Sequence, residues 1–149
     1  MKIFHLFANH KFTGPADPAL ILAAGQAAAG VDVRFLCSTV PEQKNTLEKI
    51  ASNRGLQTIQ GLRLSKHIRL SSLRSDVKKL RKLIEEEKPD FLHSHLDGDH
   101  LVATLARSAE GPALIRSRYD LSAPRGFRAS WLARHTDLWI VPTEQAAEK

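Results

Sequence analysis

The sequence predicts an α/β protein: a Rossmann-like, open parallel sheet of about six strands with helices on both faces. Short apolar runs such as residues 3–8 lack polar–apolar alternation, which is typical of strands buried on both faces of a parallel sheet. Segments with helical periodicity separate these runs along the whole chain, as in successive βαβ units. We find no internal repeat, linker or low-complexity tract, and 149 residues is the length of one ordinary domain.

The expected elements follow one another in a regular order. The expected strands cover residues 2–8, 31–36, 56–59, 91–94, 113–117 and 138–141. The expected helices cover residues 18–29, 47–53, 73–87, 99–109 and 127–134. A basic connection, residues 61–72, has no clear periodicity, and its structure cannot be read from the sequence.

Capping residues indicate where several helices begin and end. Asp17 is expected as an N-cap with Pro18 in the first helical position, and Gly30 suits the left-handed position after the same helix. Ser72 or Ser75 can cap the third helix. Thr143 resembles the N-cap of a further helix, and the six residues after it are too few to complete one, so we expect the front part of a longer protein.

Composition and length restrict the class of protein. Hydrophobic residues make up 42% of the chain and charged residues 26%, which is typical of a globular protein. No apolar stretch approaches the ~20 residues of a transmembrane helix, and the first strand begins so close to Met1 that no signal peptide fits. A single cysteine, Cys37, excludes an internal disulfide, so we expect a cytoplasmic protein.

The formal net charge of +6 suggests an acidic partner. Basic residues gather in two regions, 63–88 and 116–134, and neither has the interleaved aromatic residues of a single-strand stacking platform. We therefore expect no nucleic-acid partner. A phosphorylated substrate, an anionic membrane leaflet and a merely solvated basic surface all remain compatible with this charge.

Ligands of open parallel sheets bind beyond the carboxyl ends of the strands, and the loop 9–16 is the first such place. It contains His10 and leads through Thr13, Gly14 and Pro15 into a helix N-terminus, where backbone amides can hold a phosphate. Gly14 would allow a close approach of the ligand to the main chain, or it is a plain turn glycine. Pro15 supplies no N–H, and no G-x-G-x-x-G or Walker sequence is present.

The densest set of reactive side chains is His-Ser-His-Leu-Asp-Gly-Asp-His at 93–100. In an extended chain His93, His95 and Asp97 would point the same way, as the zinc ligands of the metallo-β-lactamase family do. The alternative is that His93 packs within its strand and Asp97 caps the next helix, which leaves His95 at the open end of the strand. Helix–strand alternation before this segment favours the second reading, so we expect no metal.

A group of charged residues follows the fifth strand: Arg116, Arg118, Asp120 and Arg125. Guanidinium groups at a strand end suit phosphate or carboxylate ligands, and an ion pair of Arg118 with Asp120 or Asp99 is the alternative. Cys37 is expected in the core rather than as a nucleophile, and no serine lies in a G-x-S-x-G elbow.

Five segments, in order, resemble family 4 glycosyltransferases. They are the opening strand with Phe-Thr-Gly-Pro-Ala-Asp at 12–17, Ala-Ala-Ala-Gly-Val-Asp-Val at 27–33, Lys-Pro-Asp-Phe-Leu-His-Ser-His at 88–95, Ile-Arg-Ser-Arg-Tyr-Asp at 115–120, and Asp-Leu-Trp-Ile-Val-Pro-Thr-Glu at 137–144. Together they extend over the whole chain. The resemblance implies a metal-independent, retaining GT-B enzyme with two Rossmann-like domains, of which residues 1–149 would be the N-terminal, acceptor-binding one.

The resemblance also implies roles for particular residues. His95 closes the family's H-x-H and would face the transferred sugar, and Thr13, Gly14 and Pro15 would lie on the donor-phosphate side. His10, Arg116, Arg118, Asp120 and Arg125 are our candidates for the acceptor. The family's pair of glutamates eight positions apart belongs to the donor domain and is missing from this sequence. We therefore expect a chain that is inactive without its donor domain.

The expected activity is transfer of a sugar from a nucleotide-sugar donor to a cell-envelope glycan or a lipid-linked acceptor. Lipopolysaccharide synthesis is one process of this kind. The basic helix 73–87 could rest on an anionic leaflet at the inner face of the membrane. Two alternatives from other classes remain: a small basic α/β binding module, and a metal-dependent hydrolase that uses the segment 93–97.

Overall fold

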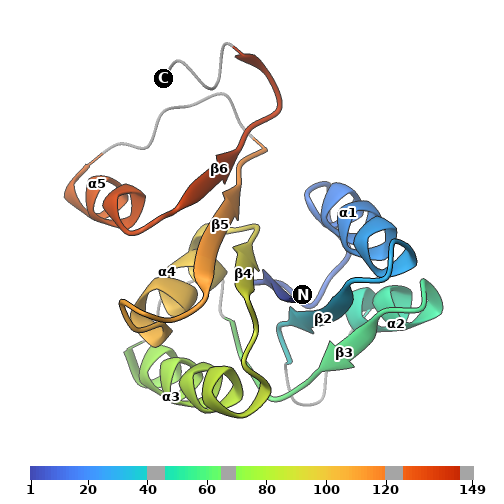
Figure 1. Cartoon of the computed structure of the whole chain (residues 1–149), viewed down its shortest axis with the longest axis horizontal. Helices are drawn as coiled ribbons and strands as arrows, with labels where there is room; N and C mark the ends of the chain where they lie inside the picture. The colour runs from blue at the N-terminus through green and yellow to red at the C-terminus, as the bar shows by residue number, and fades with distance from the viewer. Residues whose placement is uncertain (40–45, 65–69, 120–125, 145–149) are drawn as a thin grey trace.

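The computed structural model describes residues 1–39, 46–64, 70–119 and 126–144 and contains alternating strands and helices (Figure 1). The strands are β1 (Lys2–Phe7), β2 (Asp32–Cys37), β3 (Gln57–Ile59), β4 (Phe91–Ser94), β5 (Ala113–Ser117) and β6 (Leu138–Ile140). The helices are α1 (Ala16–Ala28), α2 (Thr46–Asn53), α3 (Leu70–Glu87), α4 (Asp97–Ala106) and α5 (Phe127–Arg134). The predicted α/β class and the predicted order of elements are confirmed.

All neighbouring strands are parallel, and their order in the sheet is β3-β2-β1-β4-β5-β6. The chain builds outward from β1 in one direction and then returns to add β4 on its other side. The order therefore reverses between β1 and β4, where His5 pairs in register with His93. In open α/β sheets this switch point is where ligands bind.

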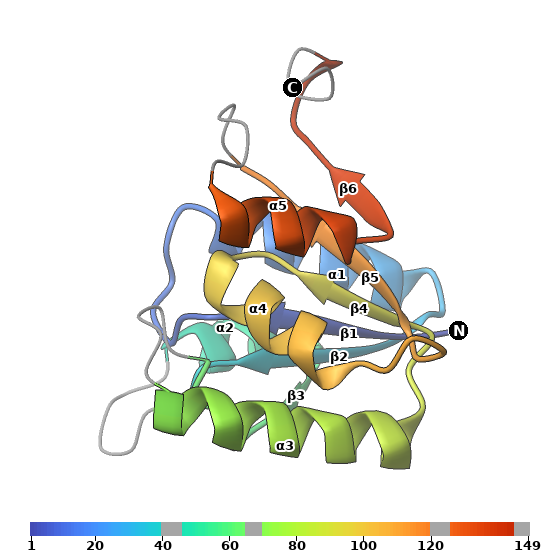
Figure 2. The same cartoon turned by 90° about the vertical axis from the view of Figure 1, so that its left-hand side faces the viewer.

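Helices cover both faces of the sheet, with α1 and α2 on one face and α3 and α4 on the other (Figures 1 and 2). Alternation along β1 produces the two cores, because successive side chains point to opposite faces. Phe4 and Leu6 pack with Leu80 of α3 and with α4, whereas Phe7 packs with Leu20 of α1 and with α2. His5 lies on the α1 face, where an apolar residue would be expected.

Several helix boundaries differ from the prediction. Asp17 is not the N-cap of α1: Pro15 occupies that position, and the Asp17 carboxylate lies 2.8 Å from Nη2 of Arg54. The helix begins at Ala16, which is completely buried in the core and whose amide donates to the carbonyl of Thr13 at 2.8 Å. Similarly, α3 begins before both candidate caps, and Ser72 lies buried inside it.

The connection that the sequence left open is part of the core. Leu62 and Leu64 are fully buried against α3, and the Asp76 carboxylate accepts 2.9 Å hydrogen bonds from the amides of Arg63 and Leu64. Burial raises the pKa of Asp76, while these two amides lower it. A carboxylate on α3 thus satisfies the buried amide of Leu64 and the partly buried amide of Arg63, which lie outside helices and strands.

Two expectations fall wholly or mainly on parts of the chain outside the described residues. These are the roles of Asp120 and Arg125, and the helix expected after Thr143, of which only Glu144 is described. Cys37 is buried at the end of β2, as expected for a core residue. None of the described helices is long and apolar enough to cross a bilayer.

Candidate functional site

Three histidines meet at the switch point of the sheet. His5 in the middle of β1 and His93 in β4 are register partners, and His95 lies directly after β4. Their exposed fractions are 0%, 1% and 1%, so all three are sealed inside the protein. The structure thus brings His5, which the sequence analysis assigned only to a strand, next to the residue expected at the reaction centre.

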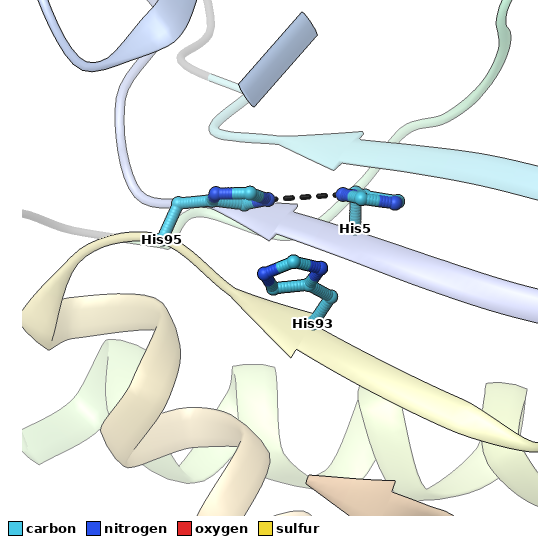
Figure 3. Close-up of side chains that lie close together, drawn as sticks. All are labelled: His5, His93 and His95. Carbon is cyan, nitrogen blue, oxygen red and sulfur yellow. Dashed lines mark hydrogen bonds between the residues drawn. The ribbon is translucent and has the colours of Figure 1, made fainter. Parts of the chain in front are cut away.

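Hydrogen bonds join this cluster to helix α1 and to the end of β5. Nδ1 of His5 lies 2.9 Å from Nε2 of His95 (Figure 3), and Nε2 of His5 lies 2.7 Å from Oε1 of Gln26 in α1. On the other side Nδ1 of His95 lies 2.6 Å from the hydroxyl oxygen of Tyr119, and Tyr119 as a whole residue is 36% exposed. Nε2 of His93 is held separately, 2.8 Å from the Ser117 hydroxyl.

Burial keeps these imidazoles neutral at pH 7. Loss of solvation lowers the pKa of His5 to about 4 and that of His93 to about 3, and it lowers the pKa of His95 well below its usual value. The neighbouring histidines and Arg116 lower the pKa of His95 further, because each would repel an imidazolium. The site therefore presents neutral nitrogen donors and acceptors rather than positive charge.

The three rings are packed in a way that does not suit a metal ion. Among the described residues, His5, His93 and His95 are the three side chains close enough to share one, with ligand nitrogens within 4.8 Å of each other. However, the rings of His93 and His95 are stacked, with centroids 4.4 Å apart and planes 18° from parallel (Figure 3). Stacked rings direct their lone pairs along parallel planes and not towards a common point, as tetrahedral zinc requires.

The extended His93–His95–Asp97 arrangement, which the sequence left as the less favoured alternative, does not form. The strand ends at Ser94, and Asp97 is the first residue of α4. Nor does Asp97 cap that helix, because the carboxylate that accepts the amides at its start belongs to Asp99. Asp97 instead lies with Oδ1 2.9 Å from Nη2 of Arg116.

Asp99 is the buried centre of the loop that carries His95. Its carboxylate accepts hydrogen bonds from the amides of Ala8, His95 and Leu96, at 2.7 to 3.1 Å. Burial raises the pKa of Asp99 to about 7, against the opposing effects of Arg116 and the three amides. The end of β1 and the loop after β4 are thereby fixed to one another beside the histidines.

The arginines after β5 have different environments. Arg116 is 7% exposed and lies between Asp97 at 2.9 Å and Asp99 at 3.9 Å, so its charge is compensated within the protein. Its Nη1 atom is buried without a hydrogen-bond partner among the described residues. The guanidinium carbon of Arg118 lies 5.9 Å from the ring centroid of Trp139, as in a cation–π contact.

The loop between β1 and α1 contains the candidate donor-side residues. Gly14 is exposed, and a Cβ atom added to it would meet nothing within 4 Å. Thr13 accepts the amide of Ala16 through its carbonyl oxygen at 2.8 Å, and Pro15 is the N-cap of α1. His10 binds α2 through its carbonyl oxygen, which accepts the Leu47 amide at 3.1 Å. The loop follows β1 and His95 follows the parallel strand β4, so both lie at the carboxyl edge of the sheet. Gly14 leaves room there for a ligand.

Sequence reasoning missed three members of the cluster: His5, Gln26 and Tyr119. A histidine within an otherwise apolar strand was the available signal for His5. Gln26 and Tyr119 carry no such signal, because their partners, His5 and His95, lie 21 and 24 residues away and meet them only in the tertiary fold.

Several solved structures have the same fold. A protein described as a UDP-N-acetylglucosamine 2-epimerase from Listeria monocytogenes matches with a TM-score of 0.72 and 17% identity, over 99% of this chain and 40% of its own. MurG of Acinetobacter baumannii matches with a TM-score of 0.66 and 15% identity, over 94% and 40%. The lipopolysaccharide outer core galactosyltransferase WaaB matches with a TM-score of 0.68 and 15% identity, over 99% and 41%.

These likenesses establish a Rossmann-like α/β fold of the kind found in GT-B enzymes, and the chain spans about 40% of the length of each structure. No curated protein sequence matches. The sequence profile of Glycosyltransferase Family 4, however, matches residues 19–149, which is most of the chain and includes the histidine cluster at β4. The chain therefore belongs to Glycosyltransferase Family 4.

Proposed function

We propose that this chain is the N-terminal, acceptor-side domain of a retaining glycosyltransferase. The enzyme would transfer a sugar from a nucleotide-sugar donor to a cell-envelope glycan or a lipid-linked acceptor. The observation that best supports this is the position of His95, in a chain of this family, at the switch point between β1 and β4 and beside the open loop at Gly14. Two of the similar structures, MurG and WaaB, suggest the cell envelope as the place to look for the acceptor.

The chemistry of the site agrees with glycosyl transfer. The reacting sugar acquires oxocarbenium character, and negative charge develops on the departing phosphate. A neutral His95 can contact a sugar hydroxyl without adding positive charge next to the oxocarbenium centre. The loop with Thr13, Gly14 and Pro15 would lie on the phosphate side, where the N-terminus of α1 contributes a favourable dipole. No metal is required in this scheme.

A second domain would complete the site. The chain spans about 40% of the length of the structures it resembles, which supports a further region that binds the donor nucleotide. We therefore expect this chain to bind UDP weakly and to transfer no sugar by itself. Sugar transfer by this chain alone would contradict the proposal that a second domain binds the donor.

The acceptor side is proposed at the ends of β5 and β6. Of the candidates, Arg118 is half-buried against Trp139, whereas Arg116 is already compensated by carboxylates and is better suited to hold the loop. His10, Asp120 and Arg125 remain candidates from the sequence. An anionic glycan is the acceptor class that fits the basic character of this edge.

Calorimetric titration of this chain at low and high salt tests the proposal. The ligands are UDP, zinc and a phosphorylated oligosaccharide that represents the acceptor. We expect salt-sensitive binding of the oligosaccharide, weakened in Arg118→Gln. The matched control is Arg134→Gln, which removes the same charge from an exposed residue at the end of α5, shortly before β6 and thus at the amino end of the strands.

Three results would contradict the proposal. The first is equal weakening by Arg118→Gln and Arg134→Gln, which would indicate a non-specific basic surface, as in a general binding module. The second is an absence of oligosaccharide binding in every condition. The third is tight zinc binding that His95→Ala abolishes, which would favour the hydrolase alternative.

Contact with an anionic membrane leaflet is a further part of the proposal, and it would place the enzyme at the inner face of the membrane. Several exposed basic side chains of α3 already have structural partners, since Lys79 binds the Gly61 carbonyl and Arg81 binds the carbonyls of Leu105 and Ala106. Arg74 and Lys78 are exposed on the same helix. Binding to anionic vesicles that falls steeply with salt, and falls again in Arg74→Gln/Lys78→Gln, is the expected result; salt-independent binding would contradict it.

A further inference from the structure

A continuous row of hydrogen-bonding side chains runs from helix α1 to the end of β5. It begins at Oε1 of Gln26 and passes through both ring nitrogens of His5 and then both ring nitrogens of His95. It ends at the hydroxyl of Tyr119, and its three successive distances are 2.7, 2.9 and 2.6 Å. Each histidine uses one nitrogen towards Gln26 and the other towards Tyr119, so the row has a direction.

The Gln26 oxygen determines that direction. A carbonyl oxygen only accepts hydrogen bonds, so Nε2 of His5 carries the hydrogen and Nδ1 of His5 is a lone pair. This lone pair in turn requires a hydrogen on Nε2 of His95, which leaves Nδ1 of His95 as an acceptor. The Tyr119 hydroxyl then donates to that nitrogen. Both rings are neutral, with one hydrogen each, so the choice at one end is transmitted to the other.

We infer that Gln26 and His5 are positioning residues that hold His95 in the Nε2–H tautomer, so that its Nδ1 accepts a hydrogen bond from a hydroxyl group. In this structure that hydroxyl belongs to Tyr119, and a substrate hydroxyl that takes the place of Tyr119 would be selected in the same way. This inference rests on the proposed function of the site. Tyr119 as a whole residue is 36% exposed and covers Nδ1 of His95, so a substrate hydroxyl would reach this nitrogen from the side of Tyr119 and would have to displace it. A lone pair repels the oxygen atoms of a phosphate, so His95 contacts the sugar or an acceptor alcohol and not the anionic part of a substrate.

The inward side of the row is suited to this positioning role. His5 is fully buried, and its ring is stacked on Phe35, with centroids 6.4 Å apart and planes 16° from parallel. On the same face of the sheet, the ring of His93 packs against both His5 and His95. The ring of His5 therefore has little freedom to turn over, and a change of hydrogen position is the remaining way to reverse the row.

The experiment is two-bond ¹H–¹⁵N NMR of the histidine rings in this chain, without ligand, at neutral pH. We expect Nε2–H tautomers for both His5 and His95. Gln26→Met preserves the size of the side chain but removes the acceptor, and an unsatisfied buried N–H is costly. His5 should then move its hydrogen to Nδ1, and His95 should follow, so that the Nε2–H pattern of both rings is lost.

Two control variants make the test specific. Gln26→Glu keeps an acceptor oxygen and should preserve the Nε2–H pattern at His95. Tyr119→Phe removes the outer donor and should leave both tautomers unchanged, because the direction is determined at Gln26. Nδ1–H tautomers in the unmodified chain, or a reversal by Tyr119→Phe but not by Gln26→Met, would overturn the inference.

A ligand titration followed by the same spectra tests the selection of a hydroxyl group. We expect methyl glucoside in large excess to shift the Nδ1 signal of His95, and inorganic phosphate to leave it unchanged. If the glucoside causes no shift, or phosphate causes one, the selection is wrong. The tautomers are measured without ligand, so failure of the proposed function leaves the positioning result standing, and the reverse also holds.

Discussion

The carboxylate of Asp99 accepts a hydrogen bond from the amide of Ala8 at 2.7 Å, across 91 positions of the sequence. The same carboxylate accepts the amides of His95 and Leu96. One buried side chain at the start of α4 thus connects the end of β1 to the loop that holds His95. The relative position of the two loops that form the candidate site depends on this carboxylate.

We predict that Asp99→Asn destabilises the protein although it preserves the shape of the side chain. Both carboxylate oxygens accept backbone amides, and the NH₂ group of asparagine would have to face one of those donors. The free energy of unfolding should fall by about 1–3 kcal/mol, as measured by urea denaturation at pH 8.5, where Asp99 with its pKa of about 7 is ionised. The control is Asp97→Asn, whose side chain is 82% exposed and should have a much smaller effect. Equal effects of the two variants would contradict the role assigned to Asp99.

A second prediction concerns Arg116. The pKa of Asp99 is raised from 3.8 to about 7 in the folded protein. Between these two pH values the unfolded chain has lost the proton that the folded chain still holds, so stability falls as the pH rises towards 7. Arg116 lowers that pKa and limits the loss. In Arg116→Met the pKa should lie higher still, and stability should continue to fall above pH 7.

Urea denaturation at pH 6 and pH 8.5 checks this prediction. The stability difference between the unmodified chain and Arg116→Met should be larger at pH 8.5. Arg116→Lys retains the charge and should show little growth of the difference with pH. A difference for Arg116→Met that is the same at both pH values would indicate that Arg116 acts through packing alone.

A third prediction concerns acid stability. The folded-state pKa values of His5 and His93 are lowered to about 4 and about 3 from an ordinary value of 6.5. Their stabilising effect is complete above pH 6.5 and is lost as the pH falls through that value, because the unfolded chain takes up protons that the folded chain does not. The free energy of unfolding should therefore decrease between pH 7 and pH 5, because the loss at the two histidines exceeds the gain from protonation of the single Asp99 carboxyl.

His93→Gln should make this loss smaller by about 1–2 kcal/mol, because one of the titrating groups is removed. Measurement at pH 7 gives the packing cost of the variant, which is then subtracted from its value at pH 5. If the free energy of unfolding falls by the same amount between pH 7 and pH 5 in His93→Gln and in the unmodified chain, His93 takes up a proton in the folded protein as easily as in the unfolded chain.

A fourth prediction separates two glycines of the first strand–helix unit. Gly30 follows α1 with a φ of +85°, which costs other residues about 1 kcal/mol, so Gly30→Ala should lower stability by that amount. Gly14 does not have a positive φ, and space around it is open, so Gly14→Ala should change stability by less than about 0.5 kcal/mol. Thermal denaturation of both variants measures the difference. If Gly14→Ala is as damaging as Gly30→Ala, the loop does not have the open conformation described.

The sequence alone determined the class of fold and the order of its elements. Uninterrupted apolar runs indicated buried parallel strands, helical periodicity between them indicated crossover helices, and Gly30 marked the end of α1. These features are local, because hydrophobic period and backbone preference depend on residues within a few positions of each other. The sequence also placed His95 directly after the fourth strand, which the structure confirms, but His95 is buried there and not open to solvent.

Only the tertiary structure decided the surroundings of His95. The register of β1 against β4 sets His5 beside it, α1 brings Gln26 to His5, and the end of β5 brings Tyr119 to its other nitrogen. Likewise the sequence favoured Asp17 and Asp97 as helix caps, whereas the fold pairs them with Arg54 and Arg116 and uses Asp99 at the start of α4. The physical reason is that hydrogen-bond partners and desolvation depend on which elements meet in space, and this is not encoded in the spacing of residues along the chain.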